Sequence, residues 1–286
     1  MLETNKENCV MMAVGGKVHN PVLKMPYKVD ESGKAFCLPG TGGICYNVKI
    51  GDSVFKFAGD HIEPCVSVQN ADEKENDALN FLACIGNTAV IVSGDAKGQR
   101  GAVTGKHGVT EHVIVHFDES ALQTLAPNDE ITVKSWGQGL KLLNYPQIAV
   151  KNCDPLLFEK LGITERNGKL IVPVKAAVPS YLMGSGIGIK TSFSGDYDIM
   201  TADKDRLEEL CLLDLRLGDV VYLKDCDSTF GRGYREGAAT VGVVVHCDSF
   251  TAGHGPGVTT IMSCKTPLLE YFIDGAANIG NYLNLF

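Results

Sequence analysis

The feature that most constrains the fold is a series of short runs rich in branched apolar residues, most of them ended by Gly, Asp or Asn. These runs are "VIVSGD", "HVIVHFD", "EITVKSW", "KLIVPV", "DVVYLKD" and "TVGVVVHCD". Branched residues favour strands, and Gly or Asp after such a run marks a turn. Because the runs do not alternate regularly with helical segments, we expect a mainly β chain built from barrels or sandwiches rather than a parallel α/β sheet.

Helical patterns are few and short. "NADEKENDALNFLACIG" predicts one helix that stops at Gly86, and "DPLLFEKLG" predicts a short helix capped by Asp154. One longer helix is predicted over 203–216. The 286 residues suggest one large domain or two ordinary ones. We predict β-rich domains over 1–150 and 151–286.

Composition narrows the classes of partner. A net charge of −8 makes nucleic acid an unlikely ligand, because binding to phosphates depends on Lys and Arg. No apolar run approaches the roughly 20 residues that cross a bilayer, so we expect no membrane association. Ten cysteines without a CxxC pair, and an N-terminus without signal-peptide character, predict a reduced, cytoplasmic protein.

The segment 89–119 resembles the KOW motif of SH3-like barrels through Gly94, Asp95, Lys97, Gly98 and Gly101. The resemblance implies an SH3-like barrel segment within the N-terminal domain, and in that family the segment contacts RNA or protein. The alternative is a barrel hairpin without a ligand, whose glycines serve only as turns.

Polar residues follow several of the predicted strands. In "GDHIEP", His61 and Glu63 would share one face of an extended chain, where an imidazole and a carboxylate can ligate a metal or share a proton. The alternative is an exposed strand end. The neighbouring "PGTGGI" loop offers the backbone N–H groups of Gly42 and Gly43 to an anion.

The stretch "KTSFSGDYDIM" places Asp196 and Asp198 two residues apart. Two carboxylates on one face of a strand repel each other unless a cation or a proton lies between them. Ser192 and Ser194 add hydroxyls that could bind substrate, or act as nucleophiles if a base lies nearby. The alternative is a plain surface turn beside a strand.

The stretch "HCDSFTAGHGPG" repeats this pattern, with His246 and Asp248 two residues apart at a strand end and His254 in a glycine-rich loop. Upstream, Arg232 and Arg235 flank a glycine turn, where a guanidinium suits a substrate carboxylate. Each histidine taken alone could equally be a satisfied structural residue.

These motifs together resemble an uncharacterised bacterial family described as a domain of unknown function with separate N- and C-terminal parts. The residues that carry the resemblance are "PGTGGI", "GDHIEP", "MGSGIG", "GDYDIMT" and "YREGAATVGVVVHCDS…AGHGPGVTT". The stretch 178–200 is also similar to the acetamidase/formamidase family of metal-dependent amidases. That family's Gly-Asp-x-His pattern is altered here, because position 198 is Asp rather than His.

We therefore hypothesise a homo-oligomeric enzyme that uses a divalent metal to hydrolyse a C–N bond of a small polar molecule. A metal-free variant would use a histidine base and the glycine-loop N–H groups. The alternative is a binding protein with an exposed basic face of Lys97, Arg100 and Lys106. The enzyme requires residues from "GDHIEP", "GDYDIM" and "HCDS…GHG" to converge in one cleft. The expected roles are catalytic for His246, Asp248 and His61; substrate-binding for Arg232, Arg235, Gly42, Gly43, Ser192 and Ser194; and metal-ligating for Glu63, Asp196, Asp198 and His254.

Overall fold

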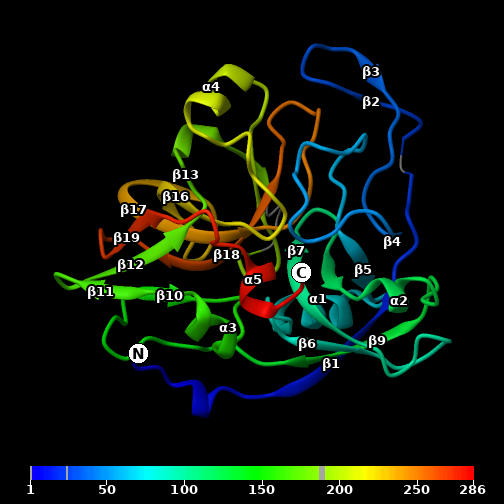
Figure 1. Ribbon diagram of the computed structural model, residues 1–286, viewed down its shortest axis with the longest axis horizontal. Helices are drawn as coiled ribbons and strands as arrows, with labels where there is room; N and C mark the ends of the chain where they lie inside the picture. Colours follow the sequence, from blue (N-terminus) through cyan, green and yellow to red (C-terminus); the bar gives the residue numbers. More distant parts are fainter. Residues whose placement is uncertain (1, 24, 187–190) are drawn as a thin grey trace.

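A computed structural model describes residues 2–23, 25–186 and 191–286, and these are mainly β, as the sequence predicts. The run "MGSGIG" lies partly outside the described residues, because positions 187 and 188 are among those left out. Figure 1 shows two β assemblies side by side, one from each half of the chain. Across the described ranges, no helix is long and apolar enough to span a membrane.

The N-terminal half forms a closed six-stranded antiparallel barrel. The last strand of the barrel pairs with the first, and one short strand extends the sheet beyond β5. In spatial order the strands are β1 (Met12–Val18), β9 (Glu130–Ser135), β6 (Thr88–Ile91), β7 (Arg100–His107), β8 (His112–His116) and β5 (Cys65–Gln69), with β4 (Ile44–Cys45) outside the barrel.

Branched side chains fill the barrel interior, which explains why the runs found in the sequence become strands. Val66, Val103, Val115 and Ile131 are all essentially inaccessible to solvent and belong to one core cluster. The segment that resembles a KOW motif supplies three consecutive antiparallel strands, β6, β7 and β8. The motif's glycines Gly94 and Gly98 adopt positive φ in the turn between β6 and β7.

The C-terminal half forms a half-barrel whose longest strands are β16, β17 and β18. A separate three-stranded sheet belongs to the same half, whereas a small two-stranded hairpin comes from the N-terminal half. In spatial order the main sheet consists of β13 (Ala176–Val178), β16 (Val220–Asp227), β17 (Gly233–Val244), β18 (Gly257–Cys264), β15 (Tyr197–Ile199) and β14 (Met183–Gly186), and β10 (Ile148–Val150) also pairs with β18. The three-stranded sheet consists of β11 (Thr164–Arg166), β12 (Lys169–Val174) and β19 (Leu269–Ile273). The hairpin consists of β2 (Lys28–Val29) and β3 (Ala35–Phe36).

The helices are short, and the predicted long helix over 203–216 is much shorter in the structure. Helix α4 spans Lys204–Glu209, and Cys211 just beyond it adopts a left-handed φ of 56° that an α-helix cannot continue through. Leu212, Leu215 and Leu217 are buried from a turn instead. The other helices are α1 (Glu73–Leu82), α2 (Glu119–Leu122), α3 (Pro155–Lys160, capped by Asp154 as predicted), α5 (Ile279–Leu283) and the 3-10 turns Lys6–Asn8 and Ser180–Leu182.

The barrel and the half-barrel meet where β7 crosses β18. The Thr259 hydroxyl accepts from Lys106 N–H at 3.3 Å and donates to Lys106 C=O at 3.0 Å. Gly105 packs so closely on Val245 that a Cβ at position 105 would collide with that side chain. This close approach brings the end of β7 next to the start of β15 and the end of β17, where the candidate site lies.

Candidate metal centre

Histidines gather at this junction although they are far apart in the sequence. Five of the seven histidines line a cavity of about 720 Å³, and His246 lies buried against two of them, with its ring centroid 5.2 Å from that of His61 and 4.3 Å from that of His107. The seventh, His116, contacts Cys65 instead. The five that line the cavity are His19, His61, His107, His112 and His254.

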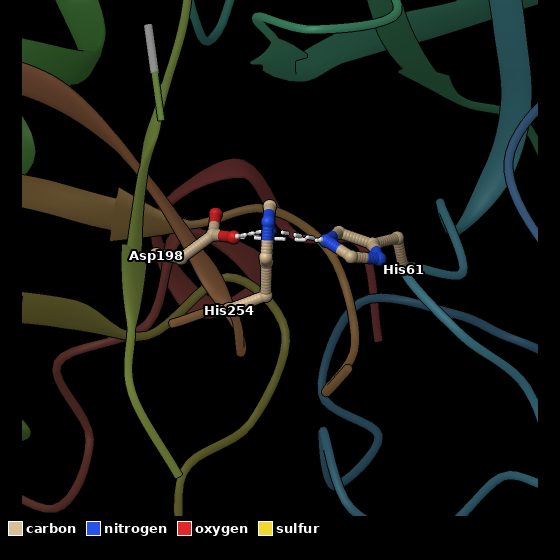
Figure 2. A group of neighbouring side chains, drawn as sticks. All are labelled: His61, Asp198 and His254. Atoms are coloured by element: carbon tan, nitrogen blue, oxygen red, sulfur yellow. Dashed lines mark hydrogen bonds and ion pairs between the residues drawn. The ribbon is translucent and has the colours of Figure 1, made fainter. Parts of the chain in front are cut away.

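The first group of possible metal ligands comprises His61, Asp198 and His254 (Figure 2). His61 lies in the loop between β4 and β5, Asp198 lies on β15, and His254 lies in the loop before β18. His254 Nδ1 is 2.8 Å from Asp198 Oδ2 and 3.1 Å from His61 Nε2. His61 Nε2 is 3.6 Å from the same carboxylate oxygen, so all three atoms face one point.

The second group comprises His107, Asp196 and His246, all buried. His107 ends β7, Asp196 directly precedes β15, and His246 follows β17 by two residues. Nε2 of His246 is 2.8 Å from Asp196 Oδ2 and 3.6 Å from Asp198 Oδ1. The two groups are therefore neighbours, and Asp198 lies between them.

Hydrogen bonds fix the orientation of three imidazoles. Nδ1 of His61 contacts Asp60 Oδ2 at 3.0 Å, and Nδ1 of His107 contacts Glu63 Oε1 at 2.6 Å. Nδ1 of His246 is 2.8 Å from its neighbour's carbonyl oxygen. In each case a proton on Nδ1 leaves the lone pair of Nε2 directed into the cluster. Metal-ligating histidines are held in this way in most proteins.

Two atoms of the second group are unsatisfied. Asp196 Oδ2 and His246 Nε2 are buried, and neither makes a hydrogen bond of acceptable geometry to any described residue although they lie 2.8 Å apart. Asp196 Oδ1, in contrast, accepts from Gly108 N–H at 2.8 Å. Buried polar groups normally have partners, and an orphan pair at a cavity is typical of a site that binds something. A Cβ at Gly257 would collide with both atoms, so glycine keeps this space open.

The carboxylates set the electrostatics of the cluster. Burial by itself lowers the pKa of His246, but its contacts with Asp196 and Asp198 outweigh burial and hold this pKa well above its usual value. Burial also lowers the pKa of His61, but its contacts with Asp198 and Asp60 outweigh burial and raise this pKa. Burial lowers the pKa of His107. Burial would raise the pKa of Asp198, but its three histidine contacts keep it well below its usual value. The cluster therefore favours positive charge, which a proton or a divalent cation can supply.

His61 has an unusual backbone, with a left-handed φ of 57°. Its N–H donates to Asp248 C=O at 3.0 Å, and the Asp60 N–H donates to Pro39 C=O at 2.9 Å. Non-glycine residues adopt this conformation at a cost of roughly 1–3 kcal/mol, and such residues are concentrated at functional sites. The conformation turns the imidazole toward Asp198, away from the direction an extended strand would give it.

The structure brings together three of the four residues expected to ligate a metal, Asp196, Asp198 and His254. His61 and His246, which were expected to be catalytic, lie among them as possible ligands. Glu63 is in neither group of possible ligands. Its carboxylate instead accepts from Ser67 and Thr110 hydroxyls and contacts Nδ1 of both His107 and His112, so it orients histidines.

Asp248 was expected beside His246 but points elsewhere. Its carboxylate accepts from the Thr201 hydroxyl and lies 3.2 Å from Lys204 Nζ. The expectation assumed that alternation continues to residue 248, whereas β17 ends at Val244. Beyond the strand, side chains two residues apart no longer share a face.

The expected substrate-binding residues lie outside the described lining of the cavity. Arg232 donates to Met183 C=O and Arg235 to Lys265 C=O, at the far end of the β16–β17 hairpin. Ser192 is fully buried against Lys151, and the Ser194 hydroxyl donates to Thr191 C=O. Gly42 N–H donates to Glu63, and Gly43 packs on Pro21, so these two do not form an anion site facing the cavity.

His107 and His112 were missed from the sequence. They lie in the segment that resembles a KOW motif, which predicted only a hairpin, and they flank its tip. The sequence offers one signal for His107, which directly adjoins Gly108 as His254 adjoins Gly253 and Gly255. The basic face proposed for that segment is not intact, since Lys106 is fully buried while Lys97 and Arg100 are exposed.

Comparison with known proteins identifies the family and gives no assigned activity. A search of curated proteins finds no match. A solved structure titled "Crystal structure of TM1086" is 48% identical over 98% of this chain and 99% of its own, with a TM-score of 0.94. Models of the N- and C-terminal domains of DUF4438, a domain of unknown function, match residues 27–159 and 160–283. The chain therefore belongs to the DUF4438 family, and the candidate metal centre draws its ligands from both of the family's domains.

Proposed function

We propose that this protein is a metal-dependent hydrolase that cleaves a C–N bond next to a carbonyl group in a small molecule. The observation that carries the proposal is the cluster of imidazole and carboxylate ligands at a cavity of about 720 Å³. A divalent ion held there would lower the pKa of a bound water and polarise a carbonyl. Imidazole and carboxylate ligands suit Zn²⁺ and neighbouring first-row metals.

The cavity walls favour a substrate with an apolar part. Val22, Leu23, Phe36 and Leu38 line the cavity together with the histidines. A small polar molecule that carries an apolar group would place that group against these side chains and its carbonyl near the imidazoles. Pockets with mostly apolar walls and a few convergent polar groups are typical of small-molecule sites.

His112 is the candidate for proton transfer. It lines the cavity, belongs to neither ligand group, and its Nδ1 contacts Glu63 Oε2 at 2.9 Å. Burial would raise the pKa of Glu63, but its contacts with His112 and His107 hold it well below the usual value, so the carboxylate stays ionised. An ionised partner keeps the proton of His112 on Nδ1 and leaves Nε2 as a base.

The choice of a C–N bond rests on the similarity of residues 178–200 to the acetamidase/formamidase family. The departure at position 198 is compatible with it, because a carboxylate can ligate a metal as well as an imidazole can. The carboxylate oxygens of Asp198 lie 3.6 Å from Nε2 of His61 and 3.6 Å from Nε2 of His246. An aspartate at position 198 therefore still offers a metal donor where the related family has a histidine.

The test compares hydrolysis of a panel of primary amides, N-acyl amino acids and matched esters by protein loaded with Zn²⁺, Mn²⁺ or Co²⁺. We expect metal-dependent amide hydrolysis that a chelator abolishes and that His246→Ala lowers at least about 100-fold. The matched control is His116→Gln, which alters a buried histidine outside the cluster. Hydrolysis of esters alone would contradict the C–N assignment, and equal activity of His246→Ala and wild type would overturn the proposal.

Location and assembly complete the proposal. We propose a cytoplasmic protein, which agrees with ten free cysteines.

We also propose a homo-oligomer, because Val22, Leu23 and Met25 are at least 60% exposed beside the cavity, and exposed apolar patches mark contact sites. Light scattering measures the mass in solution, and a monomer of 30.7 kDa would contradict the oligomer.

A further inference from the structure

We propose that the centre binds two divalent cations, and that Asp198 bridges them. One ion is held by His61, Asp198 and His254, and the other by His107, Asp196, His246 and the second oxygen of Asp198. The use of this pair in catalysis rests on the proposed hydrolase function, whereas its existence rests on the geometry alone.

The two oxygens of Asp198 face different groups of ligands. Oδ2 is 2.8 Å from His254 Nδ1 and 3.6 Å from His61 Nε2, whereas Oδ1 is 3.6 Å from His246 Nε2. Figure 2 shows the first of these groups, with both imidazole nitrogens directed at the same carboxylate oxygen. A carboxylate that divides its oxygens between two sets of histidines is placed as a bridging ligand.

The first position has the dimensions of a coordination site. Its three donor atoms are separated by 2.8, 3.1 and 3.6 Å, so they lie on a circle with a radius of about 1.9 Å. An ion slightly off the plane of this circle would be roughly 2.0–2.1 Å from each atom, the usual distance from Zn²⁺ to nitrogen or oxygen. The side chain of His254 is 26% exposed, which leaves this position open toward the cavity.

The second position carries the independent evidence of unsatisfied atoms. Asp196 Oδ2 and His246 Nε2 are buried without a hydrogen-bond partner among the described residues, and they point into the space that the missing Cβ of Gly257 leaves. A cation between them would satisfy both atoms at once. His107 adds a third donor, because its Nδ1 is occupied by Glu63 and its Nε2 remains available.

The local charge also matches two ions. Four carboxylates lie in or directly against the centre: Asp60, Glu63, Asp196 and Asp198. Lys28 compensates one of them, because its Nζ is 2.5 Å from Asp60 Oδ2; its side chain is 49% exposed. With neutral imidazoles, one divalent cation leaves one of the other three buried carboxylates uncompensated, and a second ion removes that deficit.

The experiment counts ions and tests whether they touch the same ligand. Metal-free full-length protein is titrated with Zn²⁺ against a chromogenic chelator and, separately, with Co²⁺ followed by visible absorption and electron paramagnetic resonance. We expect two ions per wild-type chain and a loss of the Co²⁺ signal at the second equivalent, because bridged ions couple magnetically. His254→Ala should bind one ion, and its Co²⁺ signal should remain uncoupled.

Two controls keep the result interpretable. Asp248→Asn changes a nearby carboxylate that is turned away from the centre, and His116→Gln changes a histidine that belongs to neither group of possible ligands, so both should bind two ions. Wild-type protein that saturates at one ion, or two ions without coupling, overturns the proposal. Two coupled ions without hydrolysis of any substrate would support the pair and reject the proposed function, whereas hydrolysis with one ion would do the reverse.

Discussion

Two clusters of buried polar side chains lie close together in this protein and are satisfied very differently. The lysine cluster consists of Lys106, Lys151 and Asn152. Lys106 Nζ donates to Asn152 Oδ1 at 2.7 Å and to Phe193 C=O at 2.6 Å. Lys151 Nζ donates to Ser192 Oγ at 2.7 Å and to two backbone carbonyls. In the candidate metal centre, by contrast, two buried atoms that face each other have no hydrogen-bond partner among the described residues.

The difference separates a structural polar cluster from one prepared for a ligand. An ammonium group has three donors, and both lysines use theirs on acceptors within the protein. Burial lowers the pKa of Lys106 to about 7 and that of Lys151 to about 8. The candidate metal centre instead keeps two atoms without a hydrogen bond beside a cavity, which stabilises the fold less and leaves donors for an ion. Changes in the metal centre should therefore alter metal affinity, and changes in the lysine cluster should alter stability.

Glu63→Gln tests the candidate metal centre through its metal affinity. Glutamine retains the size of the side chain but loses the negative charge that holds Nδ1 of His107 and of His112. Loss of such an outer partner weakens metal binding by roughly 10–100-fold. Competition with a chelator measures the affinity for Zn²⁺. Asp248→Asn is the control, and equal affinities for all three proteins would remove the orienting role of Glu63.

Lys151→Met should reduce stability and leave metal binding intact. The substitution leaves the hydroxyl of Ser192 and the carbonyls of Ser228 and Thr229 without their donor. Each buried group left without a partner costs about 1–3 kcal/mol. Denaturant unfolding measures the loss, with Lys97→Met as the exposed control that should change stability by less than about 0.5 kcal/mol. A Zn²⁺ affinity that falls as in Glu63→Gln would break the distinction between the two clusters.

The lysine cluster should also affect the pH dependence of stability. Lys151 loses its proton near pH 8 in the folded protein, but near its ordinary pKa of about 10.5 when unfolded. Between these values the unfolded chain binds more protons, so this lysine makes stability rise with pH by at most about 1.4 kcal/mol per unit. Lys151→Met should lack this increment when urea unfolding is measured from pH 8 to 10. Parallel pH profiles of the two proteins would mean that Lys151 stays protonated in the fold.

The sequence predicts the β-rich architecture well because the branched runs and turn residues act locally. The residues of the centre were predictable where polar groups directly follow or lie on a strand, as with Asp196, Asp198 and His246. His61 was expected from strand alternation, but it reaches the centre through its left-handed backbone. His107 could not be assigned, because its place depends on how β7 crosses β18.

Errors arose where a local pattern was extended too far. Alternation carried past the end of β17 misplaced Asp248, and a leucine period carried past Cys211 lengthened α4. The direction of Ser192 depends on the burial of Lys151, which is a tertiary effect. Separation along the sequence cannot by itself identify the ligands, because the candidate centre is formed by residues that come close only when the two β assemblies meet.

The meeting of β7 and β18 gives the protein a thermodynamic coupling between its two halves. Of the candidate ligands, His61 and His107 come from the barrel half, whereas the other four come from the half-barrel. An ion that needs donors from both halves binds only when they are docked, so its binding free energy adds to their association. Metal-loaded protein should then unfold in a single transition, and the metal-free chain should show its two halves melting closer to independence.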